Sequence, residues 1–164
     1  MRALSTAMAI AAAVVLAAHA AATTTGVPTI PCTDVIGQAK TPRDSGYRVV
    51  FGVVSAPPAR LMQVVATGER PWAYWRKAGL VVRAGGSTVA VSVPRAWRSR
   101  AAVMWGSSGP VPALRIAACP SPAGVWNAYA GGFLIRTRRE CVPLTFTAAG
   151  RSKTIRFGVG GACR

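Results

Sequence analysis

The chain has 164 residues and is strongly basic: 20 Lys and Arg residues stand against four acidic residues, for a formal net charge of +16. Its length predicts a single domain that can bury a real hydrophobic core. The sequence contains neither a glycine-rich phosphate-binding motif nor the acidic repeat of an EF-hand, which excludes those two classes of protein.

Residues 1–20 have the pattern of a secretory signal peptide. Arg2 precedes an apolar, alanine-rich run over residues 3–17, and Ala18-His19-Ala20 fits the small-x-small cleavage rule. We expect cleavage before Ala21, export, and no membrane-spanning segment in the mature chain. The alternative is an uncleaved anchor, but the run is short and no stop-transfer charges follow it. Cleavage would remove the only histidine and leave a net charge of about +15.

Four cysteines in an exported chain predict two disulfides. Three pairings are possible, and we favour Cys141–Cys163, the most local choice, together with Cys32–Cys119. A zinc site built from the four thiolates is the alternative. No C-x2-C pair is present, which argues against it.

Residues 21–46 are rich in Thr, Pro and Gly, and predict an extended N-terminal arm that is tethered if Cys32 is bridged. Residues 47–164 are expected to form the folded domain. Its first strand is predicted over 47–55, an apolar and β-branched run that should be central in a sheet. The run at 60–66 fits a strand or a short helix.

Later segments continue the strand pattern. Residues 80–83 and 88–93 flank a turn sequence and predict a hairpin, and residues 101–105 and 113–118 each predict a strand. In residues 129–136 the Gly131-Gly132 pair is typical of a bulge or a close backbone approach.

The last third of the chain has the clearest alternation. Leu144 and Phe146 alternate with threonines, and Ile155, Phe157 and Val159 form the apolar face of the run after Gly150. This predicts a β-hairpin with one wet face. Pairing centred near Gly150 would place Val159 opposite Cys141, and the glycine-rich tail could bring Cys163 back to form its bridge.

About eight or nine short strands with frequent turns, and no long helical period, predict an all-β fold. The expected architecture is a single antiparallel β-sandwich, Ig-like in the loose sense, or a barrel. The Cys-Trp-Cys spacing of true immunoglobulin domains is absent.

Several strings carry a resemblance: GYRVVFGVVSAPP, PWAYWRKAGLVVRAG, VSVPRAWRSRAAVMWG, LRIAAC and WNAYAGGF…CVPL…IRFGVGGAC. Together they resemble an uncharacterised family of small secreted four-cysteine proteins from GC-rich Gram-positive bacteria. The resemblance covers about Cys32 to Cys163. It implies export and a single domain, and it carries over no catalytic or binding residue.

The sequence argues against an enzyme. Without a histidine in the mature chain, Ser-His-Asp and Cys-His mechanisms are excluded, and oxidised thiols cannot act as nucleophiles. A hydrolase with a carboxylate pair is the remaining alternative. Glu69 with Glu140 is one such pair, but each is better explained as a surface charge. We therefore expect no catalytic residue, no cofactor and no metal.

Two segments interleave aromatic and basic side chains and form the candidate ligand-binding site: Trp72, Tyr74, Trp75, Arg76 and Lys77, with Trp97, Arg98 and Arg100. Stacking platforms beside positive charge suit sugar rings, bases or acidic glycans. The structural alternative is that Trp72 and Trp75 close the end of the sandwich while Tyr74 and Arg76 face water. Trp105 and Trp126 are expected in the core.

A second basic patch is predicted at strand ends from Arg136, Arg138, Arg139 and Arg151. Such a run is also typical of a solvated edge that discourages strand-to-strand aggregation. The whole basic surface has the same two explanations, because arginine far outnumbers lysine, as codon use in a GC-rich genome would produce.

These features favour a secreted or cell-envelope-associated binding module for an anionic envelope polymer or a glycan. The runner-up is a small secreted inhibitor of another protein, which would contact its target through a loop such as residues 136–140. Nucleic acid is not an expected partner, because the protein is predicted to be exported and has no nucleic-acid-binding signature.

Overall fold

The computed structural model describes residues 26–40, 42, 46–61, 63–122 and 125–163, so the predicted signal peptide lies outside the described residues. These residues form three β-sheets and two short 3₁₀ helices, η1 (Cys32–Asp34) and η2 (Arg95–Trp97). Over the described residues no sheet closes on itself. The fold is therefore all-β and of the sandwich type, as predicted, and the barrel alternative is not observed.

The largest sheet has six strands, in the order β1 (Thr29–Ile30), β11 (Ala113–Ile116), β9 (Val89–Ser92), β14 (Glu140–Ala148), β15 (Arg151–Val159) and β5 (Arg60–Leu61). The five-stranded sheet has the order β2 (Gly37–Ala39), β12 (Trp126–Tyr129), β8 (Leu80–Arg83), β4 (Val54–Ala56) and β3 (Arg48–Val50). Strands pair antiparallel except at the two edges of the six-stranded sheet, where β1 and β5 pair parallel to their neighbours.

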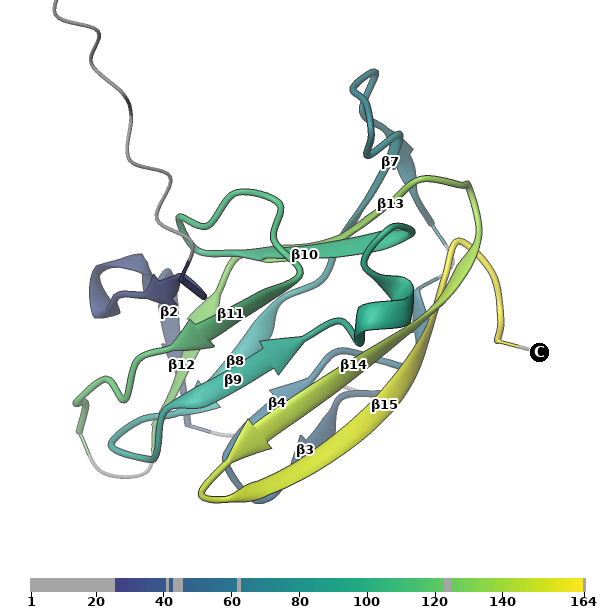
Figure 1. Cartoon of the computed structure of the whole chain (residues 1–164). Coiled ribbons are helices and arrows are strands. Elements are labelled where there is room, and N and C mark those ends of the chain that lie inside the picture. Colours follow the sequence, from purple (N-terminus) through teal and green to yellow (C-terminus); the bar gives the residue numbers. More distant parts are fainter. Residues whose placement is uncertain (1–25, 41, 43–45, 62, 123–124, 164) are drawn as a thin grey trace, which may run out of the picture.

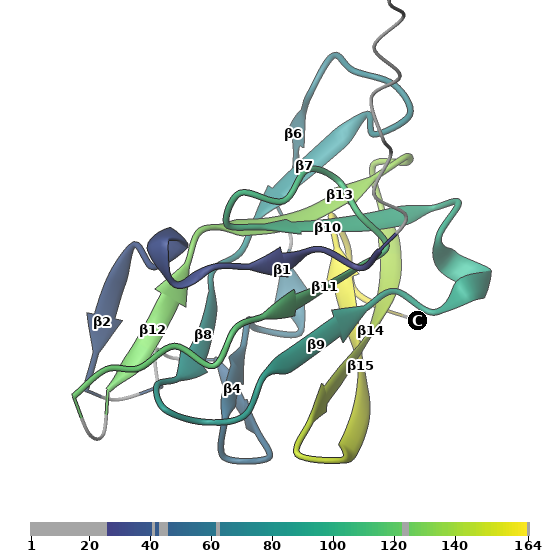
Figure 2. The same ribbon diagram turned by 60° about the vertical axis from the view of Figure 1, so that its left-hand side comes forward.

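The four-stranded sheet has the order β10 (Ala101–Trp105), β13 (Gly131–Ile135), β7 (Tyr74–Lys77) and β6 (Val65–Ala66). Its strands β10 and β13 run above the two larger sheets in both views (Figures 1 and 2). This sheet carries the candidate site.

A row of four contacting aromatic side chains crosses the core. The ring centroids of Trp105 and Phe133 lie 5.9 Å apart, and those of Phe133 and Phe157 lie 5.2 Å apart. Phe157 also packs against Phe146. The four rings are fully buried, and the Trp105 indole N–H donates to the Ala78 carbonyl at 2.8 Å. These contacts join the four-stranded sheet to the six-stranded one, and both Trp105 and Trp126 are buried as predicted.

The predicted C-terminal hairpin is confirmed as β14 and β15. The Leu144 and Phe146 side chains are buried, as are those of Ile155, Phe157 and Val159. The register differs from the prediction by one residue: Gly158, rather than Val159, lies opposite Cys141. The reason is that only two residues, Ala149 and Gly150, form the turn, with the positive φ values of 47° and 72° that tight hairpins require.

The two favoured disulfides are both present, with Cα atoms 5.4 Å apart in Cys32–Cys119 and 5.0 Å apart in Cys141–Cys163. All four cysteines are therefore engaged, and the zinc alternative is excluded. Disulfides of this kind indicate an oxidising, extracellular type of environment. Within the described residues, no helix has the length and apolar character needed to cross a membrane.

The prediction of one central strand over residues 47–55 is wrong. The segment is a tight hairpin in which β3 and β4 pair with each other, and β3 is an edge strand. Phe51 and Gly52 form the turn with φ values of 53° and 72°. The glycine makes this reversal possible, whereas the apolar run on either side of it conceals the turn in the sequence.

The predicted hairpin of residues 80–83 with 88–93 is also wrong, because β8 and β9 lie in different sheets. The turn between them carries the chain from the five-stranded to the six-stranded sheet. Its backbone is satisfied elsewhere: the Ala84 N–H donates to the Val125 carbonyl and the Gly85 N–H to the Cys119 carbonyl. The run at 60–66 likewise divides between two sheets, as β5 and β6.

The predicted close approach at Gly131-Gly132 is confirmed. The chain leaves β12 in the five-stranded sheet here and enters β13 in the four-stranded one. A Cβ on Gly131 would collide with the Met104 carbonyl, and a Cβ on Gly132 with the Arg76 carbonyl. Glycine at these positions lets β13 fit between β10 and β7.

The described part of the N-terminal arm is tethered through Cys32, as predicted, and it also contributes strands. β1 extends the six-stranded sheet and β2 extends the five-stranded sheet. The Cys119 sulfur lies 3.3 Å from the buried Tyr129 hydroxyl. Burial, with a smaller contribution from the Asp34 charge, raises the pKa of Tyr129 above its usual value, so this hydroxyl stays neutral.

Candidate functional site

Five arginines gather where β10, β13 and β7 meet at one end of the four-stranded sheet. We call this group the basic end, and it consists of Arg70, Arg100, Arg136, Arg138 and Arg139. The Arg136 N–H donates to the Arg100 carbonyl at 3.2 Å, which extends the pairing of β13 with β10 by one residue. On the other side of β13, Ile135 pairs with Tyr74 of β7. Strand pairing therefore brings segments that are far apart in the sequence to the same end of the sheet.

Two of these arginines stack on tryptophans. The Arg136 guanidinium lies 5.7 Å from the ring centroid of Trp72, and that of Arg100 lies 4.2 Å from the ring centroid of Trp97. A cation over an aromatic face is attracted by the ring quadrupole. The stacked face also limits the rotamers of a long side chain, so each guanidinium is held at a defined place.

Glu140 is the counter-charge to Arg100. Its carboxylate accepts from Arg100 Nη2 at 2.6 Å and from the Thr137 hydroxyl at 2.8 Å. Its side chain is only 3% exposed, so the expectation of a surface charge is wrong for this residue. The short connection from β13 to β14 turns the carboxylate inward against Arg100, which explains the difference.

Replacing Glu140 with Gln should lower the free energy of unfolding by about 1–3 kcal/mol, because the change weakens hydrogen bonds that a buried carboxylate makes to a charged group. The matched control is Glu69→Gln on an exposed loop, where the effect should stay within about 0.5 kcal/mol. Urea denaturation of both variants measures the difference. Equal midpoints would contradict the structural role of this ion pair.

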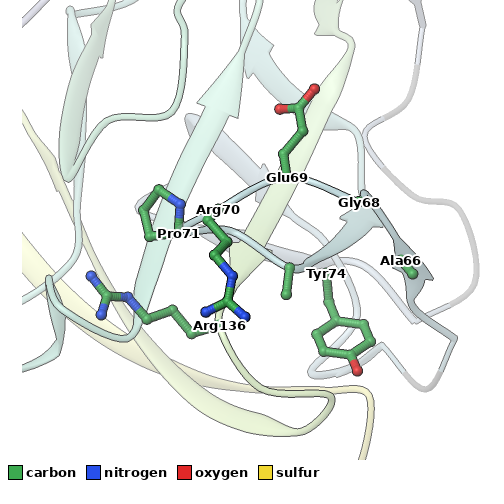
Figure 3. A pocket seen from close by; sticks show the side chains of 8 residues that line it. Ala66, Gly68, Glu69, Arg70, Pro71, Tyr74 and Arg136 are labelled. Atoms are coloured by element: carbon green, nitrogen blue, oxygen red, sulfur yellow. The ribbon is translucent and has the colours of Figure 1, made fainter.

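Each of three pockets is lined by arginines of the basic end. The first, of about 580 Å³, lies between the β6–β7 connection and the end of β13, and its lining includes Arg70, Tyr74 and Arg136 (Figure 3). The second, of about 500 Å³, is lined by Trp97, Arg100, Arg139 and Glu140 among others. The third, of about 430 Å³, is lined by Gln63, Val64, Arg138, Arg139 and Gly160. Arg139 borders the second and the third pocket, so these two pockets adjoin.

Among the residues that the structure describes, Arg100–Glu140 is the one ion pair. The other acidic residue at the basic end, Glu69, lines the first pocket but is not paired with either arginine there. Glu69 and Glu140 line different pockets, and Glu140 faces Arg100. Neither pocket is lined by both acids, so neither presents this carboxylate pair.

The structure divides the predicted aromatic segment between two faces of β7. Residues opposite one another in the ladder share a face, so Tyr74 lies with buried Ile135, and Trp75 lies with Leu134 on the other face. Tyr74 packs against the core cluster. The prediction that Tyr74 and Arg76 face water while Trp75 plugs the sandwich is therefore wrong: Tyr74 and Arg76 lie on the core face of β7, and Trp75 lies on the opposite face. Strand alternation, rather than aromatic character, decides which residues point inward.

The remaining residues of the predicted ligand-binding site lie in different parts of the structure. Lys77 is exposed on the Trp75 face, and Arg76 keeps its Nε buried without a hydrogen-bond partner in the described structure. Arg98 lies in a different hollow and donates from Nε to the Val93 carbonyl at 3.2 Å. Of the eight candidate residues, Trp72 and Tyr74 reach the first pocket region, and Trp97 and Arg100 line or flank the second.

Arg151, predicted with the second basic patch, does not belong to it. It lies at the turn end of the β14–β15 hairpin, whereas Arg139 precedes the opposite end of that hairpin. Its guanidinium stacks 4.7 Å from the Phe51 ring centroid and donates to the Phe51 carbonyl.

Arg70 is the site residue that sequence reasoning missed. It adjoins the aromatic segment, but no local pattern distinguishes it from other surface arginines. Its position opposite Arg136 depends on the pairing of β7 with β13, two strands separated by more than fifty residues.

Comparison with known proteins gives no relative. No protein-family model matches the sequence, and no curated protein or solved structure is significantly similar to it. The structure defines the class of the protein, a disulfide-stapled all-β sandwich, and the resemblance to small secreted four-cysteine proteins stays a prediction.

Proposed function

We propose that this protein is an exported binding module that holds an anionic polymer or glycan of the cell envelope at its basic end. The observation that carries the proposal is that five arginines line three pockets and that only one of them, Arg100, is in an ion pair among the described residues. Arg70, Arg136, Arg138 and Arg139 are exposed. Positive charge that no acidic side chain compensates attracts and concentrates a polyanion.

Aromatic side chains support a glycan as part of the ligand. Trp72, Tyr74 and Trp97 are half-buried and stand beside the arginines. Sugar rings and other apolar faces stack on such side chains, while charge positions the acidic groups. The two disulfides support the extracellular or envelope location in which these polymers occur.

The testing experiment is binding of the mature protein to isolated cell envelope across a salt series. Release of counterions makes the logarithm of affinity for a polyanion fall with the logarithm of salt concentration, by roughly 0.7–0.9 per neutralised charge. The double variant Arg136→Ala/Arg138→Ala should reduce this slope by roughly 1.5 and weaken binding at low salt about tenfold or more.

The matched control is Lys153→Ala/Arg156→Ala, which removes the same charge from exposed positions of β15 that line none of the three pockets. It should change affinity less than about threefold. Equal effects of the two double variants would show that only net charge matters. Absence of binding at every salt concentration would refute the proposal.

If the protein is an inhibitor of another protein, the loop that contacts the target differs from the predicted one. Residues 136–140 form a short, internally bonded turn in which the Thr137 hydroxyl donates to the Arg139 carbonyl at 3.0 Å. The connection that projects from the fold is the one between β6 and β7 (Figures 1 and 2). A stoichiometric complex with another protein that survives high salt and depends on this connection would favour an inhibitor over a polyanion-binding module.

A further inference from the structure

We propose that the first pocket is a subsite for one acidic sugar unit. Arg70 and Arg136 bind the carboxylate or phosphate group of that sugar. The inference rests on the proposed function and makes it specific, because it names the chemical group recognised and the two side chains that recognise it. The shared chemistry is an oxyanion carried on a sugar ring.

Arg70 and Arg136 both line the first pocket, and among the described residues neither is paired with an acidic side chain. Within the described structure, neither Arg70 nor Arg136 makes a side-chain hydrogen bond or an ion pair. Glu69 is the acid in the lining of this pocket, and its carboxylate points away from the Arg70 and Arg136 guanidinium groups (Figure 3). Like charges placed together without a partner provide a favourable place for an anion.

Arg136 is held ready for such a ligand. Its backbone is fixed by the hydrogen bond to Arg100, and its guanidinium stacks over Trp72. The N–H donors of this guanidinium have no hydrogen-bond partner among the described residues and are therefore available to a ligand. The planar fork of these donors matches the paired oxygens of a carboxylate or phosphate.

Arg70 lies on a loop that Thr67 closes. The Thr67 N–H donates to the Ala73 carbonyl at 3.0 Å, and its hydroxyl donates to the Trp72 carbonyl and accepts from the Glu69 N–H. These bonds tie both ends of the β6–β7 connection together. Less conformational entropy is therefore lost when Arg70 engages a ligand.

The pocket is larger than a bare ion requires. It has a volume of about 580 Å³, within the range of small-molecule sites, and Ala66, Pro71, Ala73 and Tyr74 supply apolar walls beside the two arginines. A sugar ring could contact these walls while its acidic group meets the guanidinium edges. A neutral sugar would lack the charge, and inorganic phosphate would lack the ring.

The test is a titration of the full mature protein with D-glucuronate, glucose 6-phosphate, glucose and inorganic phosphate at constant low ionic strength. Calorimetry or NMR measures the affinity for each compound. We expect at least one acidic sugar to bind about tenfold or more tightly than both glucose and inorganic phosphate. Preference for glucuronate would identify a carboxylate-bearing unit, and preference for glucose 6-phosphate a phosphate-bearing one.

Arg70→Ala and Arg136→Ala should each weaken that binding about tenfold or more, while Arg136→Lys, which keeps the charge but not the fork of donors, should lie between wild type and Arg136→Ala. Arg156→Ala is the control and should change the affinity less than about twofold. Arg70 is exposed, so its variant tests the site even if a change at Arg136 disturbs folding.

The inference is overturned if neither acidic sugar binds more tightly than glucose, if inorganic phosphate binds as tightly as the acidic sugars, or if the Arg70 and Arg156 variants behave alike. Salt-dependent envelope binding without acidic-sugar binding would remove this subsite alone. Acidic-sugar binding by a protein that does not bind envelope would remove the proposed function and retain the subsite.

Discussion

Replacement of Gly132 by alanine should lower the free energy of unfolding by at least about 3 kcal/mol, the upper end of the usual cost of overpacking. A Cβ at this position would collide with the Arg76 carbonyl and lie 2.9 Å from the Ala78 nitrogen. Both obstacles are backbone atoms, one in the neighbouring strand β7 and one in the residue that follows it, so no side-chain rotation can relieve the collision. β13 and β7 would have to separate, and these strands hold Arg136 and Tyr74 at the first pocket.

The matched control is Gly109→Ala. No atom lies within 4 Å of a Cβ built there, and its φ is not positive. This change should alter the free energy of unfolding by less than about 0.5 kcal/mol. Urea denaturation of the two variants measures the difference, and similar midpoints would show that β13 and β7 are less closely packed than the structure indicates. Loss of acidic-sugar binding in any Gly132→Ala protein that still folds would connect this packing to the pocket.

Removal of the Cys32–Cys119 disulfide, by alanine at both positions, should lower the free energy of unfolding by about 4–5 kcal/mol. The cross-link joins residues 87 apart in the chain and therefore restricts the unfolded chain strongly. In the folded state it also tethers the segment that contributes β1 and β2 to two different sheets.

Removal of Cys141–Cys163, which spans only 22 residues, should cost less, about 3 kcal/mol. The comparison of the two double variants by urea denaturation is the informative measurement, because loop length is the main difference between the bridges. If the Cys141–Cys163 variant were the less stable of the two, the native packing around the second pocket, rather than the loop length, would dominate.

The fold class and its best-defined hairpin could be predicted because they depend on local patterns. Alternation of apolar side chains specifies which face of a strand is buried, and it placed Phe146 and Phe157 in the core correctly. The same pattern does not specify a partner strand. Val89 and Val91 face inward whether β9 pairs with β8, as predicted, or with β11 and β14, as observed.

The candidate site illustrates the same division. The sequence by itself determined the net charge, the four cysteines, the glycine pair and the interleaving of arginine with tryptophan. It also placed Trp97 three residues from Arg100, near enough for their stacking to be local. Only the tertiary structure decided that Arg136 lies over Trp72, that Arg70 shares its pocket, and that Glu140 is buried against Arg100. These contacts join segments about 40 to 66 residues apart. They arise because β13 pairs on both sides, with β10 and with β7, and that pairing is set by the packing of the whole sheet on the core.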